Sequence, residues 1–261
     1  MSKKDLTLDI LICTIDDGIM KVPQMLLPER DDVRYTVSVQ QTNPESPVTV
    51  PDLLKTRQDV TLAYMEGAGL SRNRNNSLHS AIGDICLIAD DDNRYTSEHL
   101  DTILKAWHNN PDADIITFQA EDYDGYPLHP YPAPYICSVE ITFRRSSILD
   151  SGISFDERFG LGSELLCAGE EDVFLADARR KGLTIRYIPQ VIVRTNRTTT
   201  SSGFENNKKL QLTKGATFRY VYGTGSAVWR SFKEAGWYLI HKRANPFPIL
   251  FNMIKGIWIL R

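Results

Sequence analysis

Three consecutive aspartates at positions 90 to 92 are the side chains of this sequence best suited to hold a cation. They directly follow an apolar, strand-like run at 84–89. Adjacent carboxylates repel one another unless a cation or water separates them. Asp90 and Asp92 point to the same side of an extended segment, and Mg²⁺ and Mn²⁺ prefer carboxylate oxygens together with substrate phosphates. We therefore predict that Asp90 and Asp92 bind a divalent metal.

A structural role is the alternative for these three aspartates. They precede a helix-like segment at 96–109, and aspartates commonly cap helix N-termini. An acidic turn of that kind would need no metal. We favour the metal site, because the triplet directly follows a buried strand.

A glycine-bearing stretch at 67–76 opens the helix that follows the third predicted strand. Ser71 is a suitable N-cap, and the glycines permit close backbone approach. Arg72 and Arg74 fall in the first helical turn, where the helix dipole disfavours cations. We infer a nearby anion, either a diphosphate or the strand-end aspartates themselves. Pairing with surface acids such as Glu66 is the alternative.

A second acidic cluster begins the helix-like segment 170–181, where Glu170, Glu171 and Asp172 fill the first turn. The helix dipole alone explains acids at a helix start, and basic residues fill the last turn of the same segment. A catalytic role is the alternative, because a loop with two glycines leads into this helix. Glu171 or Asp172 would then accept a proton from a substrate hydroxyl as a general base.

Alternating strand-like and helix-like segments predict an α/β fold with a mainly parallel sheet flanked by helices on both faces. Ligands bind beyond the carboxyl ends of the strands in such sheets. The chemistry is therefore expected just after each strand. The strand-like runs lie at 8–13, 35–40, 60–65, 84–89 and 113–119, and the helix-like segments at 70–81 and 96–109.

The composition is that of an ordinary globular protein, with 42% hydrophobic and 24% charged residues. Four scattered cysteines form no C-x-x-C pair, which argues against a metal or disulfide framework and favours a reducing compartment. The N-terminus lacks a signal-peptide pattern, and no apolar run reaches the length of about 18 residues that spans a bilayer. We expect a cytoplasmic protein that is soluble or peripheral on the inner face of the membrane.

Charge is distributed unevenly along the chain, whose net charge is −3. Residues 205–261 hold ten Lys and Arg against two acids, which gives +8 there and leaves −11 for residues 1–204. We predict a catalytic domain over 1–204 and a basic helical C-terminal extension over 205–261. An anionic partner for the extension would be phospholipid, a phosphate-bearing ligand or nucleic acid, and solvated helix faces are the alternative. Of these partners we expect the membrane surface and no nucleic acid.

The last apolar segment, 246–260, is too short and too interrupted by Lys255 to cross a bilayer. It fits the interface of an anionic membrane, because basic residues precede it at 242 and 243. Docking on the body of the protein or on a second subunit are the alternatives.

In combination, these features resemble the family 2 glycosyltransferases of the GT-A (Rossmann-like) fold, over residues 8–195. Their order and spacing are more specific than any one of them alone. No Gln-x-x-Arg-Trp motif of the processive synthases is present. The matching segments are the strand 8–14, Gly69-Leu-Ser-Arg-Asn-Arg-Asn, Ala89-Asp-Asp-Asp-Asn, Phe155-Asp-Glu-Arg-Phe-Gly and Gly169-Glu-Glu-Asp. In addition, Tyr222-Gly-x-Gly225 is similar to an element of those members that carry a helical C-terminal extension.

The resemblance implies an inverting, non-processive transferase that uses a nucleoside-diphosphate sugar, Mn²⁺ or Mg²⁺, and a glycan or lipid-linked acceptor in polysaccharide biosynthesis. The aspartate triplet matches the DXD motif of the family. Asp90 and Asp91 would then contact the nucleotide sugar, and Asp90 and Asp92 the metal.

The other site residues follow from the same resemblance. Glu171 and Asp172 match the Glu-Asp pair of the family, in which Asp172 is the expected general base. Thr14, Asp16 and Arg72 fall where nucleotide contacts are expected.

Two positions depart from the family pattern. Arg194 follows the strand 191–193, where many relatives carry a histidine, so either the metal is completed by other ligands or Arg194 contacts phosphate directly. The first strand is followed by Thr14-Ile-Asp-Asp-Gly in place of the usual Asn/Asp pattern, which leaves the nucleotide contact there open.

Tyrosines at 123, 126, 131 and 135 punctuate a proline-rich loop. Aromatic rings stack on the apolar faces of sugars, so this loop fits a lid or an acceptor site, and packing of the rings on the domain is the alternative.

Two other functions fit parts of the sequence. A nucleotidyltransferase also uses paired aspartates, but it should carry a glycine-rich, basic signature directly after the first strand, which residues 14–19 lack. A catalytically inactive module of the same fold that binds sugar nucleotides would be expected to lose its acids, whereas both acidic clusters are intact.

Overall fold

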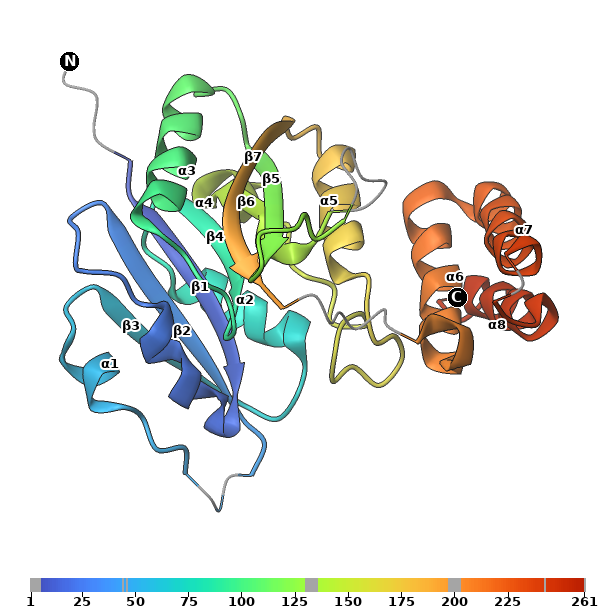
Figure 1. Ribbon diagram of the computed structural model, residues 1–261, viewed down its shortest axis with the longest axis horizontal. Helices are drawn as coiled ribbons and strands as arrows, with labels where there is room; N and C mark the ends of the chain where they lie inside the picture. The colour runs from blue at the N-terminus through green and yellow to red at the C-terminus, as the bar shows by residue number, and fades with distance from the viewer. Residues whose placement is uncertain are drawn as a thin grey trace. The chain divides into compact units, whose positions relative to one another are not determined.

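A seven-stranded sheet occupies the first part of the chain (Figure 1). The computed structural model describes residues 6–43, 45, 47–129, 136–196, 203–241 and 243–260. The spatial order of the strands is β3-β2-β1-β4-β6-β5-β7, and β6 alone runs antiparallel to its two neighbours. The predicted α/β class is confirmed. The strands are β1 (Leu8–Ile15), β2 (Val33–Gln41), β3 (Val60–Glu66), β4 (Ile85–Asp90), β5 (Ile115–Asp122), β6 (Ile141–Arg144) and β7 (Ile185–Thr195).

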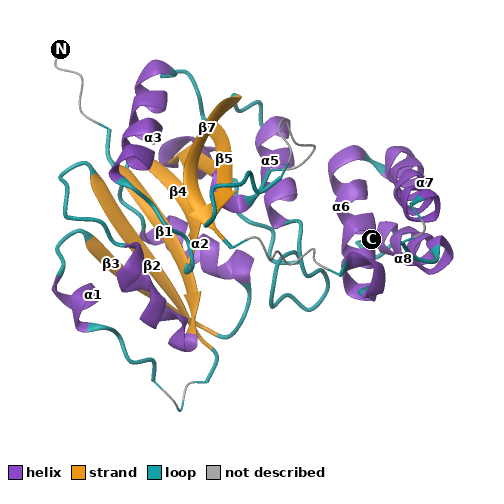
Figure 2. Ribbon diagram, viewed as in Figure 1, coloured by secondary structure: helices purple, strands orange, loops and turns teal. Residues whose placement is uncertain are grey.

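Helices flank the sheet and also form the C-terminal part of the described chain (Figure 2). Those between strands are η1 (Asp16–Met25), α1 (Asp52–Thr56), α2 (Leu70–Ser80), α3 (Ser97–Asn109), η2 (Ser138–Glu140), α4 (Arg145–Ser151) and α5 (Glu170–Arg180), where η marks a 3₁₀ helix. Those after β7 are η3 (Phe204–Asn206), α6 (Lys208–Tyr222), α7 (Thr224–Ile240) and α8 (Pro246–Ile257).

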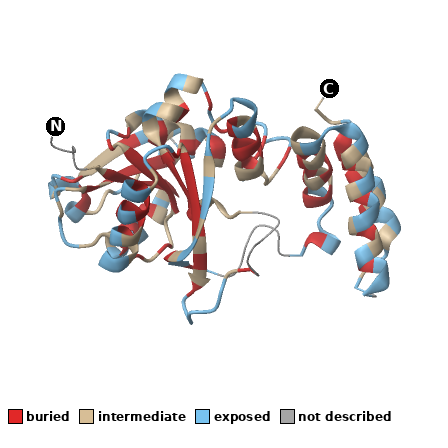
Figure 3. Cartoon of the chain, turned by 90° about the horizontal axis from the view of Figure 1, so that it is seen from above, coloured by how far each residue is buried: buried red, intermediate tan, exposed pale blue. Residues whose placement is uncertain are grey.

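The central strands are buried on both faces, as their apolar sequences predict. Residues Ile85 to Ala89 of β4 are all buried, and buried positions run along the strands in Figure 3. Alternate side chains point to opposite faces of a strand. One face packs against α3 through Leu100, Ile103 and Trp107. On the opposite face, the Cys13 thiol lies 3.8 Å from the Ser77 hydroxyl of α2.

Helix α3 begins as the sequence predicts. Thr96 is its N-cap, and the Thr96 hydroxyl accepts a hydrogen bond from the backbone N–H of His99 at 3.3 Å. The alternative in which the aspartate triplet caps this helix is therefore wrong, because Thr96 fills that position. The triplet is left for another role.

Several short elements were not predicted, among them η1 and β6. Pro23 inside η1 argues against a regular helix there, and β6, with four residues, is too short for a hydrophobic period to be recognised. The place of β6 between β4 and β5 depends on pairing with strands that are distant in sequence. Local pattern carries no information about such pairing.

Contacts divide the chain into two compact units. The first comprises Met1–Ala68, Arg72–Ser154 and Asp177–Arg197, and the second comprises Gly69–Ser71, Phe155–Ala176 and Thr198–Arg261. The predicted division between residues 204 and 205 stays a prediction.

Close backbone contact joins α6 to α8 in the second unit. A Cβ atom on Gly215 would lie 1.9 Å from the Met253 carbonyl oxygen, and one on Gly256 would lie 1.9 Å from that of Leu212. Only glycine permits this approach, since no side chain fits in that space. One face of α8 is thereby buried against its own unit. Within the described residues, no helix is both long enough and apolar enough to cross a membrane.

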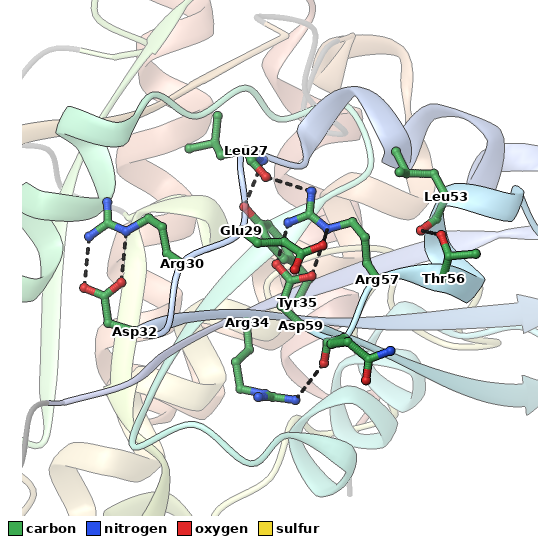
Figure 4. Close-up of polar contacts among 11 residues, drawn as sticks. Leu27, Glu29, Arg30, Asp32, Arg34, Tyr35, Leu53, Thr56, Arg57 and Asp59 are labelled. Carbon is green, nitrogen blue, oxygen red and sulfur yellow. Dashed lines mark hydrogen bonds and ion pairs between the residues drawn. The ribbon is translucent and has the colours of Figure 1, made fainter.

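A charged network holds the amino ends of β2 and β3 (Figure 4). Arg57 donates to both oxygens of the Asp59 carboxylate, from Nε at 2.8 Å, and its Nη1 donates to the Leu27 carbonyl at 2.7 Å. The Leu27 N–H donates to the Tyr35 hydroxyl at 3.1 Å. The hydrogen bonds from Arg57 lower the pKa of Asp59 below its ordinary value. This network lies at the strand ends opposite to the predicted site.

Candidate active site

The ends of β1 and β4 lie side by side where the strand order reverses. In the parallel β1–β4 pair, Cys13 stands opposite Asp90, so the segments that follow both strands leave the same edge of the sheet. The chain continues to β2 and β3 on one side of β1, whereas β4 lies on the other side. Such a switch point is where open α/β sheets bind ligands. Residues 14–17 and 90–93 therefore leave the sheet at the same edge.

Asp91 is held by residues that follow β1. The Thr14 hydroxyl donates to Asp91 Oδ2 at 2.7 Å, and Lys21 Nζ lies 3.2 Å from Asp91 Oδ1. A Cβ atom on Gly18 would lie 2.5 Å from both Thr14 Oγ1 and Asp91 Oδ2, so glycine is required for this packing. Thr14 and Asp91, both predicted site residues, are thus brought together.

Asp90 pairs with an arginine of α2. Arg74 Nη2 lies 3.4 Å from Asp90 Oδ1 and donates to the Ser138 hydroxyl at 2.9 Å. The Arg74 side chain is 3% exposed and that of Asp90 is 42% exposed. The inferred anion beside this helix start is therefore Asp90, which confirms one of the two partners expected from the sequence.

Ser71 does not cap α2 as predicted. The helix already begins at Leu70, and the Ser71 hydroxyl donates to the Phe159 carbonyl at 2.7 Å. Both residues belong to the second unit. A serine hydroxyl near a helix start can accept a hydrogen bond from a backbone N–H of the first turn or donate one to a distant carbonyl. The sequence pattern does not distinguish these two roles.

Asn93 fastens the aspartate triplet to β7. Its side-chain oxygen accepts from the Asp90 N–H at 2.9 Å, and its Nδ2 donates to the Thr195 hydroxyl at 2.9 Å. Thr195 Oγ1 in turn lies 3.5 Å from Asp92 Oδ1, and the Tyr123 hydroxyl donates to the Asp92 carbonyl. Asn93 is fully buried, so the turn that carries the triplet is fixed from within the domain.

The electrostatics of the triplet favour a cation. Burial, followed by the charges of Asp90 and Asp91, raises the pKa of Asp92 above its ordinary value. Lys21 and Arg74 are the cations whose contacts with the triplet are described above. Three carboxylates beside two cations leave a net negative charge, and a hard divalent ion fits oxygen donors of this kind.

Asp16 contacts the end of β2. Its two carboxylate oxygens accept from the Thr42 N–H at 2.8 Å and from the Thr42 hydroxyl at 2.6 Å, which lower its pKa. Asp16 adopts a positive φ of 47°, uncommon outside glycine, and this backbone turn aims the carboxylate at Thr42. Asn73 of α2 links β1 to β2, because its Nδ2 donates to the carbonyls of Thr14 at 3.0 Å and Ser38 at 3.1 Å.

The two remaining arginines of interest differ from Arg74. Arg72 is exposed, and its Nη1 lies 3.4 Å from the Ala68 carbonyl. Arg194 Nε donates to Glu121 Oε1 at 2.6 Å, and its backbone pairs with that of Arg94. Arg194 is therefore an ion-pair partner of Glu121 here, and whether it also contacts phosphate stays a prediction.

The start of α5 is built within the second unit. Gly169, with φ of +85°, precedes the helix, and a Cβ atom there would lie 2.5 Å from the Thr217 hydroxyl oxygen. Phe155 and Phe174 stack with their ring centroids 4.5 Å apart, which joins the preceding loop to the helix. Glu171 and Asp172 are both half-buried in the first turn.

The tyrosine-rich loop is described in part. Tyr123 and Tyr126 are exposed, at 49% and 61%, on a turn in which the Asp122 N–H donates to the Tyr126 carbonyl at 2.8 Å. Exposed rings fit the predicted sugar contact better than packing on the domain. Tyr131 and Tyr135 lie outside the described residues.

Several residues of this edge had no predicted role. Asn73 and Asn93 lay inside the quoted motifs, so their position was a signal although their hydrogen bonds were not foreseen. Gly18 ended the quoted segment after the first strand, but its contact with Asp91 was not foreseen. Nothing in the local sequence marked Lys21, whose contact with Asp91 depends on how η1 packs beside the end of β4. Thr195 likewise reaches the triplet only because β7 joins the same sheet.

Comparison with known proteins indicates the class of enzyme. Residues 41–158, just under half of the chain, match the sequence model of glycosyl transferase family 2. Over this stretch the chain is therefore similar to the family 2 glycosyl transferases. The glycosyltransferase prediction is thereby confirmed in preference to the nucleotidyltransferase alternative. No curated protein sequence matches the chain significantly.

Solved structures similar to this glycosyltransferase share its fold. The 1–349 segment of S. aureus TarS superposes with a TM-score of 0.60 at 12% identity, over 95% of this chain and 90% of that one. A second structure of S. aureus TarS superposes with a TM-score of 0.56 at 14% identity. The match covers 89% of this chain but only 44% of that TarS chain. The mannosyltransferase PcManGT from Pyrobaculum calidifontis, in complex with GDP-Man and Mn²⁺, gives 0.53 at 15% identity, over 98% and 71% of the two chains. These likenesses confirm the GT-A fold.

Proposed function

We propose that this protein is an inverting, metal-dependent, non-processive glycosyltransferase that moves a sugar from a nucleoside-diphosphate sugar to a glycan or lipid-linked acceptor. The gathering of Asp90, Asp91 and Asp92 at the switch point of a family 2 domain carries the proposal. The similar structures include TarS with UDP-GlcNAc and PcManGT with GDP-Man and Mn²⁺, so donors of this class are the first to test.

We assign the donor end to the edge formed by β1 and β4. Asp90 and Asp92 would hold Mn²⁺ or Mg²⁺, which supplies positive charge that stabilises the departing diphosphate. Asp91 is oriented by Thr14 and Lys21, and it would accept hydrogen bonds from the nucleotide sugar. Asp16, which is half-buried, and Arg72, which is exposed, would add contacts to the nucleotide.

We assign the proton chemistry to the start of α5. The Asp172 carboxylate would accept the proton of the acceptor hydroxyl as its oxygen attacks the anomeric carbon. The new glycosidic bond forms on the face opposite to the departing oxygen, the old anomeric bond breaks, and the nucleoside diphosphate leaves with the electron pair. Glu171, one position earlier in the first turn, would support Asp172 electrostatically.

A binding experiment separates the donor role from the base role. The thermal unfolding midpoint of the full chain is measured with UDP-GlcNAc and with GDP-Man, each with and without Mn²⁺. We expect at least one donor to raise the midpoint in a Mn²⁺-dependent manner, and Asp92→Asn to remove that increase. Asp172→Asn should keep the increase but abolish release of nucleoside diphosphate in the presence of acceptor.

Two results would overturn parts of this proposal. If neither sugar nucleotide raised the midpoint, the donor class would be wrong. If Asp172→Asn turned over at a near-normal rate, the base assignment would be wrong. Binding without transfer in the wild-type protein, across glycan and lipid-linked acceptors, would instead support the inactive sugar-nucleotide-binding alternative.

We further propose that the C-terminal helices bind an anionic membrane surface, which would bring a lipid-linked acceptor to the enzyme. Helix α8 buries Ile249 and Met253 but exposes Phe247 and Phe251 at 76% and 69%. On α7, Trp229 is 69% exposed. Exposed aromatic rings on a segment with a charge of +8 match the combination by which peripheral helices bind anionic lipids.

Point variants test the membrane proposal better than deletion of the last helix, because deletion would expose the buried contacts between α6 and α8. Sedimentation with phosphatidylglycerol-containing vesicles is expected for the wild-type chain, and the double variant Phe247→Ser, Phe251→Ser should reduce it severalfold. Ile82→Ser, a change at an apolar residue of the first unit that is 63% exposed, is the control. Equal sedimentation of wild type and double variant would remove the idea.

A further inference from the structure

A second group of potential metal ligands belongs to the part of the chain that connects β5 to β6. The side-chain ligand atoms of His129, Cys137 and Glu140 all lie within 4.8 Å of one another. His129 is 5% exposed, Glu140 is fully buried and Cys137 is half-buried. Neither the sequence patterns nor the proposed donor site assigns a role to these three residues.

Glu140 is oriented before any metal binds. Its Oε1 accepts from the Ala120 N–H of β5 at 3.1 Å, and its Oε2 accepts from the Cys137 N–H at 2.8 Å. His129 Nε2 lies 3.1 Å from the same carboxylate.

The donor set is that of zinc and not of magnesium. An imidazole nitrogen, a thiolate and a carboxylate oxygen are the ligands found together at Zn²⁺, whereas Mg²⁺ takes oxygen alone. Bonds of about 2.0–2.3 Å to a tetrahedral ion place neighbouring ligand atoms roughly 3.3–3.7 Å apart. The 3.1 Å between His129 Nε2 and Glu140 is close to that spacing, and the Cys137 sulfur lies within 4.8 Å of both.

We propose that His129, Cys137 and Glu140 bind one Zn²⁺ ion, with solvent in the fourth position. On binding, the metal replaces the proton of the Cys137 thiol and any proton on His129 Nε2, and these protons go to solvent. The ion joins the end of the turn after β5 to the start of η2. Ser138, next to Cys137, accepts the hydrogen bond of Arg74, so the zinc site also fixes a residue that positions the partner of Asp90.

A buried ion pair between His129 and Glu140, with Cys137 as a bystander, is the competing explanation of this cluster. The two explanations differ in what the sulfur does. In an ion pair the Cys137 backbone N–H suffices, and replacing the thiol with a hydroxyl changes little. In a zinc site the thiolate is a ligand, and the same replacement removes it.

Metal binding to the full chain distinguishes them. The protein is stripped with a chelator, loaded with Co²⁺ as a spectroscopic substitute or with Zn²⁺, and desalted. We expect one metal per chain, with a thiolate-to-cobalt charge-transfer band in the near ultraviolet. Cys137→Ser should lose the band and weaken Zn²⁺ binding about tenfold or more. Cys167→Ser, the same change at the other half-buried cysteine, should bind like the wild type.

Further variants test whether misfolding, or metal bound at the aspartate triplet, could account for the result. Asp92→Asn should keep the cobalt–thiolate band, since the band reports sulfur ligation alone. His129→Gln should weaken Zn²⁺ binding while its far-ultraviolet circular dichroism stays that of the wild type. A wild-type protein without the band, or a Cys137→Ser variant that binds Zn²⁺ with unchanged affinity, would overturn the zinc site and leave the ion pair.

Discussion

Arg74 of α2 reaches the carboxylate of Asp90 across 3.4 Å while its own side chain is almost completely buried. A cation at this place offsets part of the charge of three adjacent aspartates. It also binds the Ser138 hydroxyl, so one side chain joins α2, the end of β4 and the start of η2. The aspartate triplet is therefore partly neutralised by the protein itself before a metal binds.

Replacing Arg74 should make the stability of the protein depend more strongly on metal. Arg74→Met removes charged hydrogen bonds from a buried position, and we expect the free energy of unfolding to fall by about 1–3 kcal/mol. Added Mn²⁺ should narrow the gap between variant and wild type, because the ion supplies the missing positive charge. Denaturant unfolding with and without Mn²⁺ measures both effects.

Arg72→Met is the matched control for this change, since Arg72 lies on the same helix but is exposed. Its unfolding free energy without nucleotide should stay within about 0.5 kcal/mol of the wild type. A gap for Arg74→Met that Mn²⁺ leaves unchanged would argue against a metal at the aspartate triplet.

Loosening Asp91 should weaken donor binding without unfolding the protein. Thr14→Val keeps the shape of the side chain but removes the 2.7 Å hydrogen bond to Asp91. We expect the dissociation constant for the sugar nucleotide identified in the binding experiment to rise about threefold to tenfold, which corresponds to one hydrogen bond of roughly 0.5–1.5 kcal/mol. Isothermal titration calorimetry with Mn²⁺ present measures the change.

Gly18→Ala offers an independent test of the same contact, since its new methyl group would force Thr14 Oγ1 and Asp91 Oδ2 apart. Donor binding as tight as that of the wild type in both variants would show that the orientation of Asp91 is unimportant.

The contact between α6 and α8 should tolerate no added methyl group. In Gly215→Ala the new Cβ would overlap the Met253 carbonyl, and in Gly256→Ala it would overlap the Leu212 carbonyl. We expect each change to lower the free energy of unfolding by about 1–3 kcal/mol, the usual cost of overpacking. Thermal or urea unfolding provides the measurement.

A glycine of α7 provides the matched control. Gly236 has no atom within 4 Å of the position its Cβ would take, so Gly236→Ala should be neutral or should stabilise the helix by up to about 1 kcal/mol. Equal stability of Gly215→Ala and Gly236→Ala would contradict the close approach of the two helices.

The ion pair of Arg57 and Asp59 should stabilise the fold only while Asp59 is ionised. Its folded-state pKa lies below the ordinary value of 3.8, because Arg57 donates hydrogen bonds to the carboxylate. The stabilisation is therefore fully present above that ordinary value and is lost as pH falls through the lower folded-state pKa. The difference in unfolding free energy between wild type and Asp59→Asn should be constant from about pH 7 to pH 5 and shrink below about pH 4.

Urea unfolding across this pH range measures the difference, and Asp52→Asn is the control. The Asp52 side chain is 93% exposed and pairs with Lys55 at the surface, so its removal should change stability little at any pH. A difference for Asp59→Asn that stays constant down to pH 3 would show that the pKa of Asp59 is not lowered.

Much of the first unit follows from sequence pattern. The apolar runs before Asp90 and around Ile10 predict buried parallel strands, and their order with the intervening helices predicts the edge at which ligands bind. The start of a helix near Thr96 is recognisable from the pattern of the residues that follow it. These features are local, because the period of a strand or helix and the chemistry of a cap depend on neighbouring residues.

The sequence by itself determined the α/β class, the aspartate triplet and the acidic start of the helix at Glu170. Only the tertiary structure decided that Asp90, among the anions that the sequence left open, pairs with Arg74. It alone decided that Thr14 and Lys21 hold Asp91 and that His129 meets Glu140 in the interior. Each of these contacts joins segments whose meeting depends on which strands pair and in what register. Strand pairing is a property of the whole sheet, so no local pattern around any one of these residues contains it.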